Sequence, residues 1–141
     1  MLLVDGTGIP LDFLTEAANI SEYKLALATI DGVSVAARPL HPRKHPKQLV
    51  ADKGYDAAWL RRAIRQRNMT PYIPKRRKQG HTEEPRYNER IKPLYTTRWI
   101  VERTNAWLQN YRRIVVRWDR NADTYEAFIE FACILICLRR L

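Results

Sequence analysis

Two carboxylates, Asp52 and Glu102, stand in sequence settings from which they could bind a ligand or a metal ion. The apolar run at 48–51 predicts a short buried strand, and Lys-Gly-Tyr at 53–55 predicts a tight turn after it. Asp52 should therefore lie at the carboxyl end of a strand, which is the edge where open α/β sheets bind their ligands. This position makes Asp52 a better site candidate than Asp56, which we expect to cap the helix that follows.

Glu102 has two interpretations that its own stretch leaves open. In the first, it pairs with Arg98, four residues earlier, as a surface ion pair that stabilises a helix by only about 0.2–0.5 kcal/mol. In the second, the Glu102 carboxylate is itself a coordinating ligand, held by a helix that packs on the core. Its basic neighbours are then placed to receive an anionic substrate. Most helix carboxylates are solvated, so a choice between the two needs the rest of the chain.

The element that carries Glu102 is predicted from helical spacing. Apolar or half-apolar residues recur from Ile100 to Val115 at steps of three and four, which favours a helix that starts near Tyr95 and continues through 111–115. A second stripe on the same helix is polar and lies beside the apolar one. Its members are Tyr95, Arg98, Glu102, Asn105 and Gln109.

The remaining elements are read from caps, turns and apolar runs. Apolar runs on either side of Gly6-Thr7-Gly8 predict an antiparallel hairpin, and Asp5 at its turn is ordinary turn chemistry. A helix of about 11 residues should begin after Ser21 and end near Gly32. Residues 56–65 predict a helix, and 70–74 a short strand. A capping box at Asp123 should open a buried packing helix that reaches residue 138.

The charge of the chain is concentrated in one part of it. The net charge is +10 over 141 residues, and segment 38–78 holds thirteen bases and two acids. Prolines predict a basic loop at 38–47, and a segment without periodicity predicts a mobile charged loop at 75–90. Such a surface favours a polyanion, and phosphate backbone is the partner we expect.

The size and the cysteines limit the other possibilities. A chain of 141 residues predicts a single domain with a real core, and no apolar run is long enough to span a membrane. Cys133 and Cys137 lie in the most apolar stretch and read as core thiols. A cytoplasmic, DNA-associated location is the default expectation.

Several motifs together resemble the DDE transposases of bacterial insertion sequences, in the group named after insertion sequences four and five. The resemblance covers nearly the whole chain. It is carried by Ala-Asp-Lys-Gly-Tyr-Asp at 51–56, by Arg-Trp-Ile-Val-Glu-Arg-Thr-Asn-Ala-Trp-Leu at 98–108 with Tyr-Arg-Arg at 111–113, by Ala-Cys-Ile-Leu-Ile at 132–136, and by the opening residues 3–11.

The resemblance implies an α/β fold of the ribonuclease-H-like type, with a mixed sheet flanked by helices. It implies that Asp52 and Glu102 are the catalytic, metal-binding carboxylates of a two-ion Mg²⁺ (or Mn²⁺) site that cleaves and joins DNA. The residues it implies for DNA contact are Lys53, Tyr95, Arg98, Arg112 and Arg113. Gln109 stands where the family pattern has Lys. The resemblance therefore does not imply, at this position, the DNA contact that the family gives to that Lys.

One catalytic Asp of the family has no counterpart here, because it lies on a strand before the hairpin that opens this chain. The sequence therefore resembles the carboxyl-terminal part of a transposase, truncated at the amino-terminal strand, and we expect the chain alone to be inactive. It could be a decayed remnant, or the second half of a product joined to an upstream-frame polypeptide. A homodimer acting on paired DNA ends is expected from the family.

Two other function classes rank below transposase. A nuclease of the same fold would use Asp52 and Glu102 but would not join DNA. A non-catalytic nucleic-acid-binding protein would depend on the basic segment alone, and it would not explain a strand-end Asp together with a helix Glu.

Overall fold

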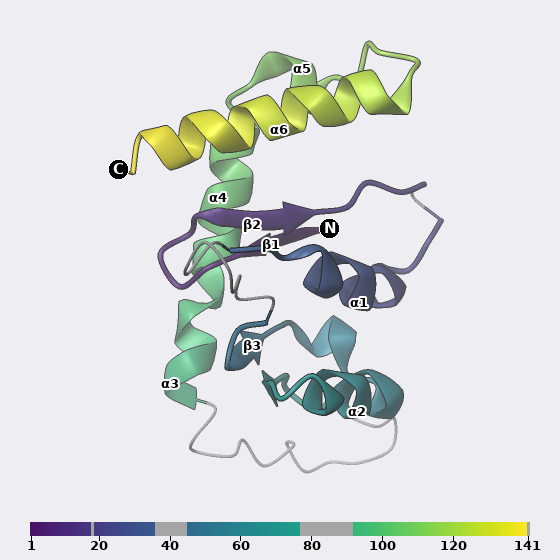
Figure 1. The fold of residues 1–141 in the computed structure, drawn as a ribbon, viewed down its shortest axis with the longest axis vertical. Coiled ribbons are helices and arrows are strands. Elements are labelled where there is room, and N and C mark those ends of the chain that lie inside the picture. The colour runs from purple at the N-terminus through teal and green to yellow at the C-terminus, as the bar shows by residue number, and fades with distance from the viewer. Residues whose placement is uncertain (18, 36–44, 77–91, 141) are drawn as a thin grey trace.

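The computed structural model describes residues 1–17, 19–35, 45–76 and 92–140, and Figure 1 shows how they are arranged. These residues form four short strands and a set of helices, which confirms a mixed α/β architecture. The order is β1 (Leu2–Val4), β2 (Pro10–Phe13), α1 (Glu22–Gly32), β3 (Gln48–Val50), η1 (Lys53–Tyr55), α2 (Ala58–Gln66), β4 (Thr70–Tyr72), α3 (Lys92–Tyr95), η2 (Thr96–Arg98), α4 (Trp99–Leu108), α5 (Arg112–Val115) and α6 (Ala122–Leu138).

The opening hairpin is as the sequence predicts. Strands β1 and β2 pair antiparallel, with Leu3 opposite Asp12. Gly8 has a φ of 92°, a backbone conformation that side chains other than glycine's rarely adopt. A Cβ atom at Gly8 would also lie 2.8 Å from the Arg103 guanidinium, so the glycine lets the turn approach α4 closely. The hairpin is thereby fixed against the helix that carries Glu102.

The second pair of strands is parallel and is connected by α2. Gln48 lies opposite Thr70, and Val50 lies opposite Tyr72. Leu49 at the centre of β3 is buried, as its apolar run predicts. Within the described residues the strands form two separate two-stranded sheets, β1–β2 and β3–β4, and not the one continuous mixed sheet that the resemblance implies.

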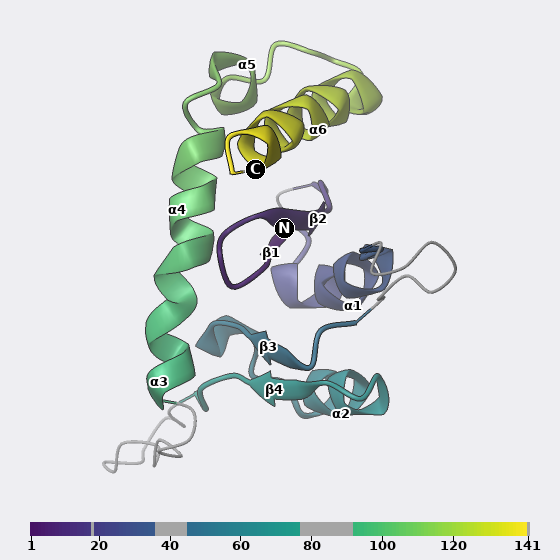
Figure 2. The ribbon, with the colours of Figure 1, turned by 60° about the vertical axis from the view of Figure 1, so that its left-hand side comes forward.

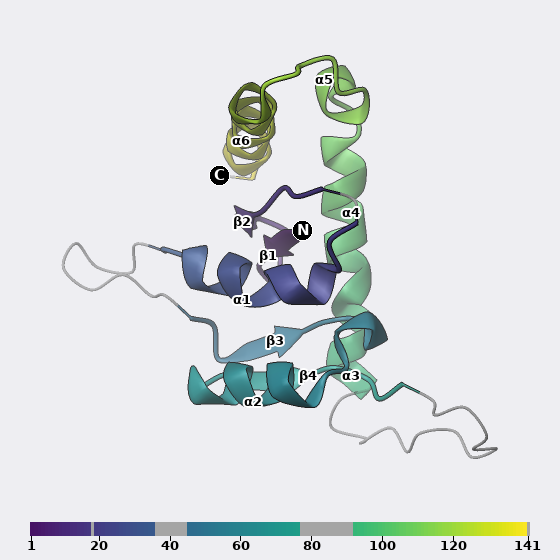
Figure 3. The same cartoon turned by 90° about the vertical axis from the view of Figure 1, so that its right-hand side faces the viewer.

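The main apolar core joins both sheets through α1 and α2. Ala26 and Ile30 of α1 pack with Leu60 and Ile64 of α2, and Leu3 of the hairpin packs against the same cluster. Helix α1 spans the 11 residues that the sequence predicts. Figure 3 shows α1 between the hairpin and the β3–α2–β4 unit. The core is therefore what holds β3, and with it Asp52, in a fixed place.

Helix α2 corrects one prediction. It begins at Ala58 with Ala57 in the capping position, so Asp56 is not its cap. The Asp56 carboxylate instead accepts hydrogen bonds from the Arg61 side chain at 2.9 and 2.7 Å and from the Arg76 backbone N–H at 2.7 Å. Two strong charged donors outcompete a single helix N–H for this carboxylate.

The predicted long helix through Glu102 is divided. Helices α3, η2 and α4 follow one another as a column (Figure 2), but the chain turns at residues 109–111 before α5. The N–H groups of Asn110 and Tyr111 bond to carbonyls three residues back, at 3.2 and 3.1 Å, and Tyr111 is extended. Asparagine favours helix ends, and the turn lets Tyr111 pack against the cluster around Leu108.

Helix α6 differs from its prediction in two ways. It begins at Ala122 with Asn121 as its cap, whose side chain accepts from the Asp123 N–H at 2.9 Å, so Asp123 lies in the first turn and is not the cap. It is also not buried all round. Ile129, Ala132 and Ile136 face α4 and the core, whereas Phe131, Ile134 and Leu138 are exposed.

The cysteines, the absence of a long apolar helix and the predicted loops remain to be compared with the structure. Cys133 and Cys137 are both half-buried and free, and burial raises the pKa of the Cys133 thiol to about 11. Among the described residues, no helix has the length and apolar character needed to cross a membrane. Most of the predicted loops at 38–47 and 75–90 lies outside the described residues, which include only 45–47 and 75–76 of them.

Candidate active site

Asp52 lies where the sequence predicts, directly after β3. It caps the short helix η1: its carboxylate accepts the Lys53 backbone N–H, and its carbonyl accepts the Tyr55 N–H at 3.0 Å. One carboxylate oxygen is committed to the backbone, and the side chain is still 43% exposed. The turn therefore fixes the side chain and leaves the second oxygen, Oδ2, for a partner beside the end of β3.

Glu102 projects from the first turn of α4. Helix α4 is held in place on its other side by Thr104, which is fully buried and donates its hydroxyl to the Gly8 carbonyl at 2.8 Å. The Glu102 side chain is 57% exposed. A fixed helix with an exposed carboxylate is the arrangement that the ligand interpretation of Glu102 requires.

Arg98 joins the two carboxylates. Its Nη1 lies 3.2 Å from Asp52 Oδ2, and its Nη2 lies 3.0 Å from Glu102 Oε1. The guanidinium also lies over the Tyr95 ring, 5.7 Å from the ring centroid. The two interpretations of Glu102 are thus not exclusive, because the ion pair with Arg98 exists and it also brings Asp52 and Glu102 to one cation.

The energetic weight of this bridge is small. All three side chains are at least one-third exposed, and exposed ion pairs contribute only about 0–1 kcal/mol each. Such a bridge is easily exchanged for other partners. Arg98 can therefore turn to a phosphate, with which it would form charge-assisted hydrogen bonds of similar geometry, and leave the two carboxylates to a different cation.

The donor set fits a hard divalent cation in part. Carboxylate oxygens are the ligands that Mg²⁺ prefers, and water and substrate phosphate usually supply the others. The Arg98 guanidinium already lies between Asp52 and Glu102, so one positive group contacts both carboxylates. Among the described residues, no cluster of three or more Asp, Glu, His or Cys forms around them.

Tyr55 supports the turn that holds Asp52, a role that the sequence reasoning missed. Its hydroxyl donates to Glu22 Oε2 at 3.1 Å and ties the turn to the start of α1. Burial, and then the neighbouring Glu22 carboxylate, raise the pKa of Tyr55 well above its ordinary value. Tyr55 therefore stays a neutral hydrogen-bond donor. Tyr55 belongs to the motif at 51–56, but its hydrogen-bond partner Glu22 lies 33 residues away, so the spacing of the motif could not reveal this contact.

Asp5 does not belong to the site, as the turn interpretation predicts. Its Oδ1 accepts from the Thr7 N–H, the Thr7 hydroxyl and the Ile9 N–H at 2.8, 2.8 and 2.9 Å. Partial burial pushes the pKa of Asp5 upward, but these hydrogen bonds outweigh it and hold the pKa below its usual range. Asp5 is an ionised turn residue.

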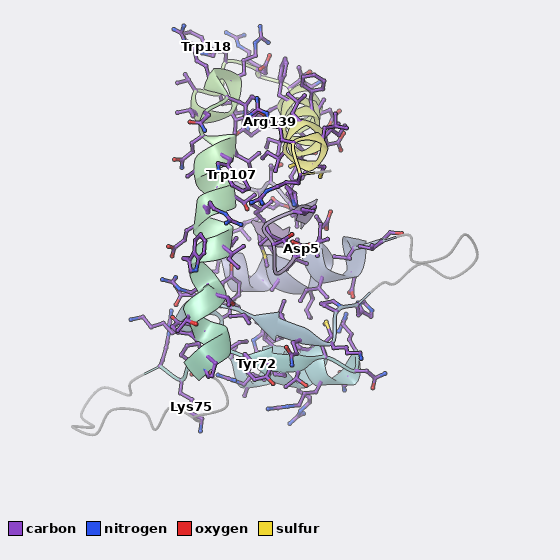
Figure 4. All side chains as sticks on the ribbon, turned by 90° about the vertical axis from the view of Figure 1, so that its left-hand side faces the viewer. Asp5, Tyr72, Lys75, Trp107, Trp118 and Arg139 are labelled. Atoms are coloured by element: carbon purple, nitrogen blue, oxygen red, sulfur yellow. The ribbon has the colours of Figure 1, made fainter. Side chains whose placement is uncertain are left out.

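The residues expected to contact DNA fall into two groups. Lys53 and Tyr95 adjoin Asp52 and Arg98, so they lie beside the carboxylates. Arg112 and Arg113 lie on α5, at the opposite end of α4, which is about 15 Å long. Figure 4 shows this separation, with Trp118 near the α5 end and Lys75 near the α3 end. The structure therefore does not bring Arg112 and Arg113 to the site.

Trp99, on α4, is 52% exposed although it is a large aromatic residue. Arg103 lies between Trp99 and Trp107, with its guanidinium 4.7 and 4.8 Å from the two ring centroids, and it donates to the Thr7 carbonyl at 2.5 Å. Trp99, Arg103 and Trp107 follow one another at steps of four residues, which on a helix predicts that the three side chains stack as a ladder. The ladder fastens α4 to the hairpin turn.

Comparison with known proteins gives this geometry a family context. The family model described as the transposase DDE domain matches residues 1–137. A protein of Burkholderia cepacia, whose name describes it as a transposase for insertion sequence element IS402, is 36% identical over 141 residues, which are 99% of this chain. The chain spans 62% of the length of that relative. No solved structure gives a significant match.

Proposed function

We propose, from the premise that this chain belongs to the DDE transposases of insertion sequences, that it supplies two of the metal-binding carboxylates for DNA cleavage and strand transfer. Asp52 and Glu102 are those carboxylates. The observation that supports this assignment is the single guanidinium of Arg98 that contacts both of them, at 3.2 and 3.0 Å. Two carboxylates that lie 50 positions apart in the sequence thereby contact one cationic side chain.

Asp52 and Glu102 would hold divalent cation, Mg²⁺ or Mn²⁺, as the family does. In such sites, two ions about 3.5–4 Å apart neutralise the charge that grows on the attacking and leaving oxygens of an in-line displacement. The carboxylates contribute fixed oxygen ligands, one on a rigid turn and one on a helix. Their exposure leaves room for the water and phosphate oxygens that complete the coordination.

The cationic residues then handle DNA. Arg98 would form charge-assisted hydrogen bonds with a substrate phosphate, and the Tyr95 ring against which its guanidinium lies would help to keep it in position. Lys53 adds positive charge at the same strand end. Arg112 and Arg113, at the far end of α4, would contact a more distant part of the duplex. The basic composition of the chain supports backbone binding of this kind.

In this proposal, only the whole transposase has a ribonuclease-H-like sheet and a complete set of metal ligands. The described residues form two half-sheets, which are the separate pairs β1–β2 and β3–β4, and they bring two carboxylates to one arginine. The chain spans 62% of the length of its relative from Burkholderia cepacia. We therefore expect the isolated 141-residue chain to cleave and join no DNA. Activity would require the remaining polypeptide, a homodimer on paired ends, or both, on DNA in the bacterial cytoplasm.

The test is a transposition assay of the complete element in cells. Asp52→Asn and Glu102→Gln each keep the side-chain shape but remove the charge, and each should lower transposition by roughly a thousandfold or more, about 4 kcal/mol of transition-state stabilisation. Glu130→Gln is the matched control, because Glu130 is likewise an exposed helix glutamate, on α6. Transposition that survives either site substitution would refute the proposed role.

A further inference from the structure

The segment between α4 and α6 exposes an aromatic ring among cations. Trp118 is 73% exposed, and Val115 and Val116 close to it in the sequence are 56% and 45% exposed. Apolar residues scattered singly over a surface are ordinary, but three of them within four positions form a patch that indicates a contact site. We call residues 112–120 the basic corner, because they also include Arg112, Arg113, Arg117 and Arg120.

The one carboxylate of the basic corner is mostly covered. The Asp119 side chain is only 20% exposed, and its Oδ1 lies 3.8 Å from Arg113 Nη1. The Asp119 carbonyl also accepts a hydrogen bond from Arg117 Nε at 3.1 Å. By contrast, the Arg113 side chain is 61% exposed, and Arg112, Arg117 and Arg120 are exposed as well. The basic corner therefore presents positive charge and an aromatic ring to solvent.

Helix α6 holds two of these arginines in place. The Arg113 guanidinium lies 4.6 Å from the centroid of the Phe128 ring, and the Arg117 guanidinium lies 5.1 Å from that of Tyr125. Tyr125 also donates its hydroxyl to the Ile114 carbonyl at 3.0 Å, which ties α5 to α6. A guanidinium that lies over a ring keeps its N–H donors directed outward in its own plane, where they suit a phosphate. The corner is thus preorganised for phosphate.

A polyanion that follows α4 from the carboxylate site would arrive at the basic corner. Figure 4 shows Trp118 near the end of α4 opposite to Lys75. Residues 103–118 contain four arginines and no Asp or Glu, so this segment offers no repulsive charge on the way. Helix α4 is about 15 Å long. One DNA strand advances about 3.4 Å per nucleotide, so it would cover that length in about four to five nucleotides.

Phosphate binding by arginines does not explain why Trp118 is exposed among them. Proteins hold unpaired nucleotides by stacking their bases on aromatic side chains that lie beside cations. The bases of an intact duplex are stacked on one another and must leave the helix before they can reach a protein ring. Trp and Arg are also enriched in the centres of protein interfaces. Four arginines against one mostly covered carboxylate favour a polyanion over a protein partner.

We propose that the basic corner is a second DNA contact, at which Trp118 stacks on one unpaired base while Arg113 and Arg117 bind phosphates of the same strand. The inference rests on the proposed function for the identity of the polyanion as DNA. It adds a contact for a single unstacked base, about four to five nucleotides from the carboxylates. Because every base has a π face, the contact selects an unpaired base and not a particular sequence.

Affinity for two matched DNA probes tests the contact without metal or cleavage. The probes are a fluorescein-labelled duplex and the same duplex with one bulged adenine. Each is titrated with the 141-residue chain in EDTA and followed by fluorescence anisotropy. We expect the bulged duplex to bind roughly fivefold more tightly, or better, because stacking of one base on Trp118 is added to phosphate binding that both probes share.

Variants separate stacking from phosphate binding. Trp118→Ala should abolish the preference for the bulged duplex and leave the affinity for the intact duplex unchanged, whereas Trp118→Phe should keep part of the preference. Arg113→Gln and Arg117→Gln should each weaken both probes equally and reduce the slope of log affinity against log salt by about one. Phe131→Ala is the matched control, because Phe131 is an exposed aromatic residue that follows Glu130 on α6 and lies outside the basic corner.

Three results would overturn the inference. The first is equal affinity of the parent chain for the two probes. The second is a Trp118→Ala chain that keeps the preference or loses affinity for both probes alike. The third is a Trp118→Ala chain that self-associates less in sedimentation while both DNA affinities stay unchanged, which would assign the ring to a protein contact. If the alanine variant fails to fold in urea titrations, Trp118→Phe gives the same comparison.

The test is independent of the carboxylates. In EDTA, an Asp52→Asn chain should prefer the bulged duplex as the parent chain does. Transposition that tolerates Asp52→Asn would refute the proposed function and leave this preference standing. Equal affinity for the two probes would refute the contact at Trp118 and leave the roles of Asp52 and Glu102 untouched.

Discussion

The site depends on how each carboxylate in this chain is used. Three aspartates serve structure: Asp5 holds the hairpin turn, Asp31 pairs with Arg67, and Asp56 pairs with Arg61. Hydrogen bonds to these partners outweigh burial where it opposes them, and the pKa of each lies below its ordinary value. Asp52 and Glu102 differ because their shared partner is an exposed arginine that can leave. The partners of these three aspartates therefore distinguish them from Asp52 and Glu102, the two carboxylates that we propose as metal ligands.

Asp5 gives a prediction at this scale. Asp5→Ala removes the acceptor of three hydrogen bonds and should lower the free energy of unfolding by about 1–3 kcal/mol at pH 7, as measured in urea. The folded pKa of Asp5 is lowered, so its stabilisation is present above the unfolded pKa of about 3.9 and is lost as the pH falls through the folded value. The variant should therefore be less sensitive to acid than the parent chain.

Asp12, on the same hairpin, is the control with opposite sign. Burial raises its pKa, so its ionised form costs stability at neutral pH. Asp12→Asn should raise the free energy of unfolding at pH 7. If Asp5→Ala leaves the free energy of unfolding at pH 7 unchanged or raises it, as Asp12→Asn should, the assignment of Asp5 as a turn acceptor is wrong.

The sequence predicted the turn role of Asp5 and the strand-end position of Asp52 correctly, and where it failed the partner was remote. Asp5 was identified because its turn chemistry is local. Asp56 was misassigned as a helix cap because Arg76, twenty residues away, cannot be paired with it from spacing alone. The bridge from Arg98 to Asp52 spans 46 residues and was invisible for the same reason. Local chemistry is readable from sequence, and contacts across the fold are not.

Helix α4 is the element that places Glu102, and its attachment to the hairpin is the feature to test. Arg103 stacks between Trp99 and Trp107 and reaches the Thr7 carbonyl, while Thr104 reaches Gly8. Cation–π contacts are worth about 0.5–1 kcal/mol each at exposed sites. The attachment holds α4 against the hairpin loop through the two residues that directly follow Glu102 in the sequence.

Arg103→Ala should lower the free energy of unfolding by about 1–3 kcal/mol, because two ring contacts and one hydrogen bond are lost. Arg103→Lys should recover only part, since an ammonium lacks the planar guanidinium that stacks on both rings. Urea unfolding followed by tryptophan fluorescence measures both. Arg120→Ala, at an exposed arginine, is the control and should be within about 0.5 kcal/mol of the parent. Equal losses at both positions would contradict the attachment.

Periodicity predicted the helices but not where they end or which face is covered. It extended the Glu102 helix through residues 109–111, where packing of Tyr111 and the three-residue hydrogen bonds of a turn prevail. It treated α6 as buried all round, although Phe131, Ile134 and Leu138 are exposed. A pattern of apolar residues reports what could be buried. The neighbouring elements decide what is buried.

At the scale of the whole molecule, the two half-sheets are the main departure from expectation. The sequence predicted the α/β class and each of the four strands. It could not predict that β1–β2 and β3–β4 remain separate, because strand pairing depends on which edges meet in space.

The central claim, that Asp52 and Glu102 share one cation site, is tested most directly by titrating Mn²⁺ into the ¹⁵N-labelled chain and measuring paramagnetic broadening of its amide signals. We expect broadening centred on residues near Asp52 and Glu102. It should strengthen in Arg98→Ala, which removes the competing cation, and be lost in the Asp52→Asn, Glu102→Gln double variant. Broadening centred elsewhere, or unchanged in the double variant, would contradict the claim.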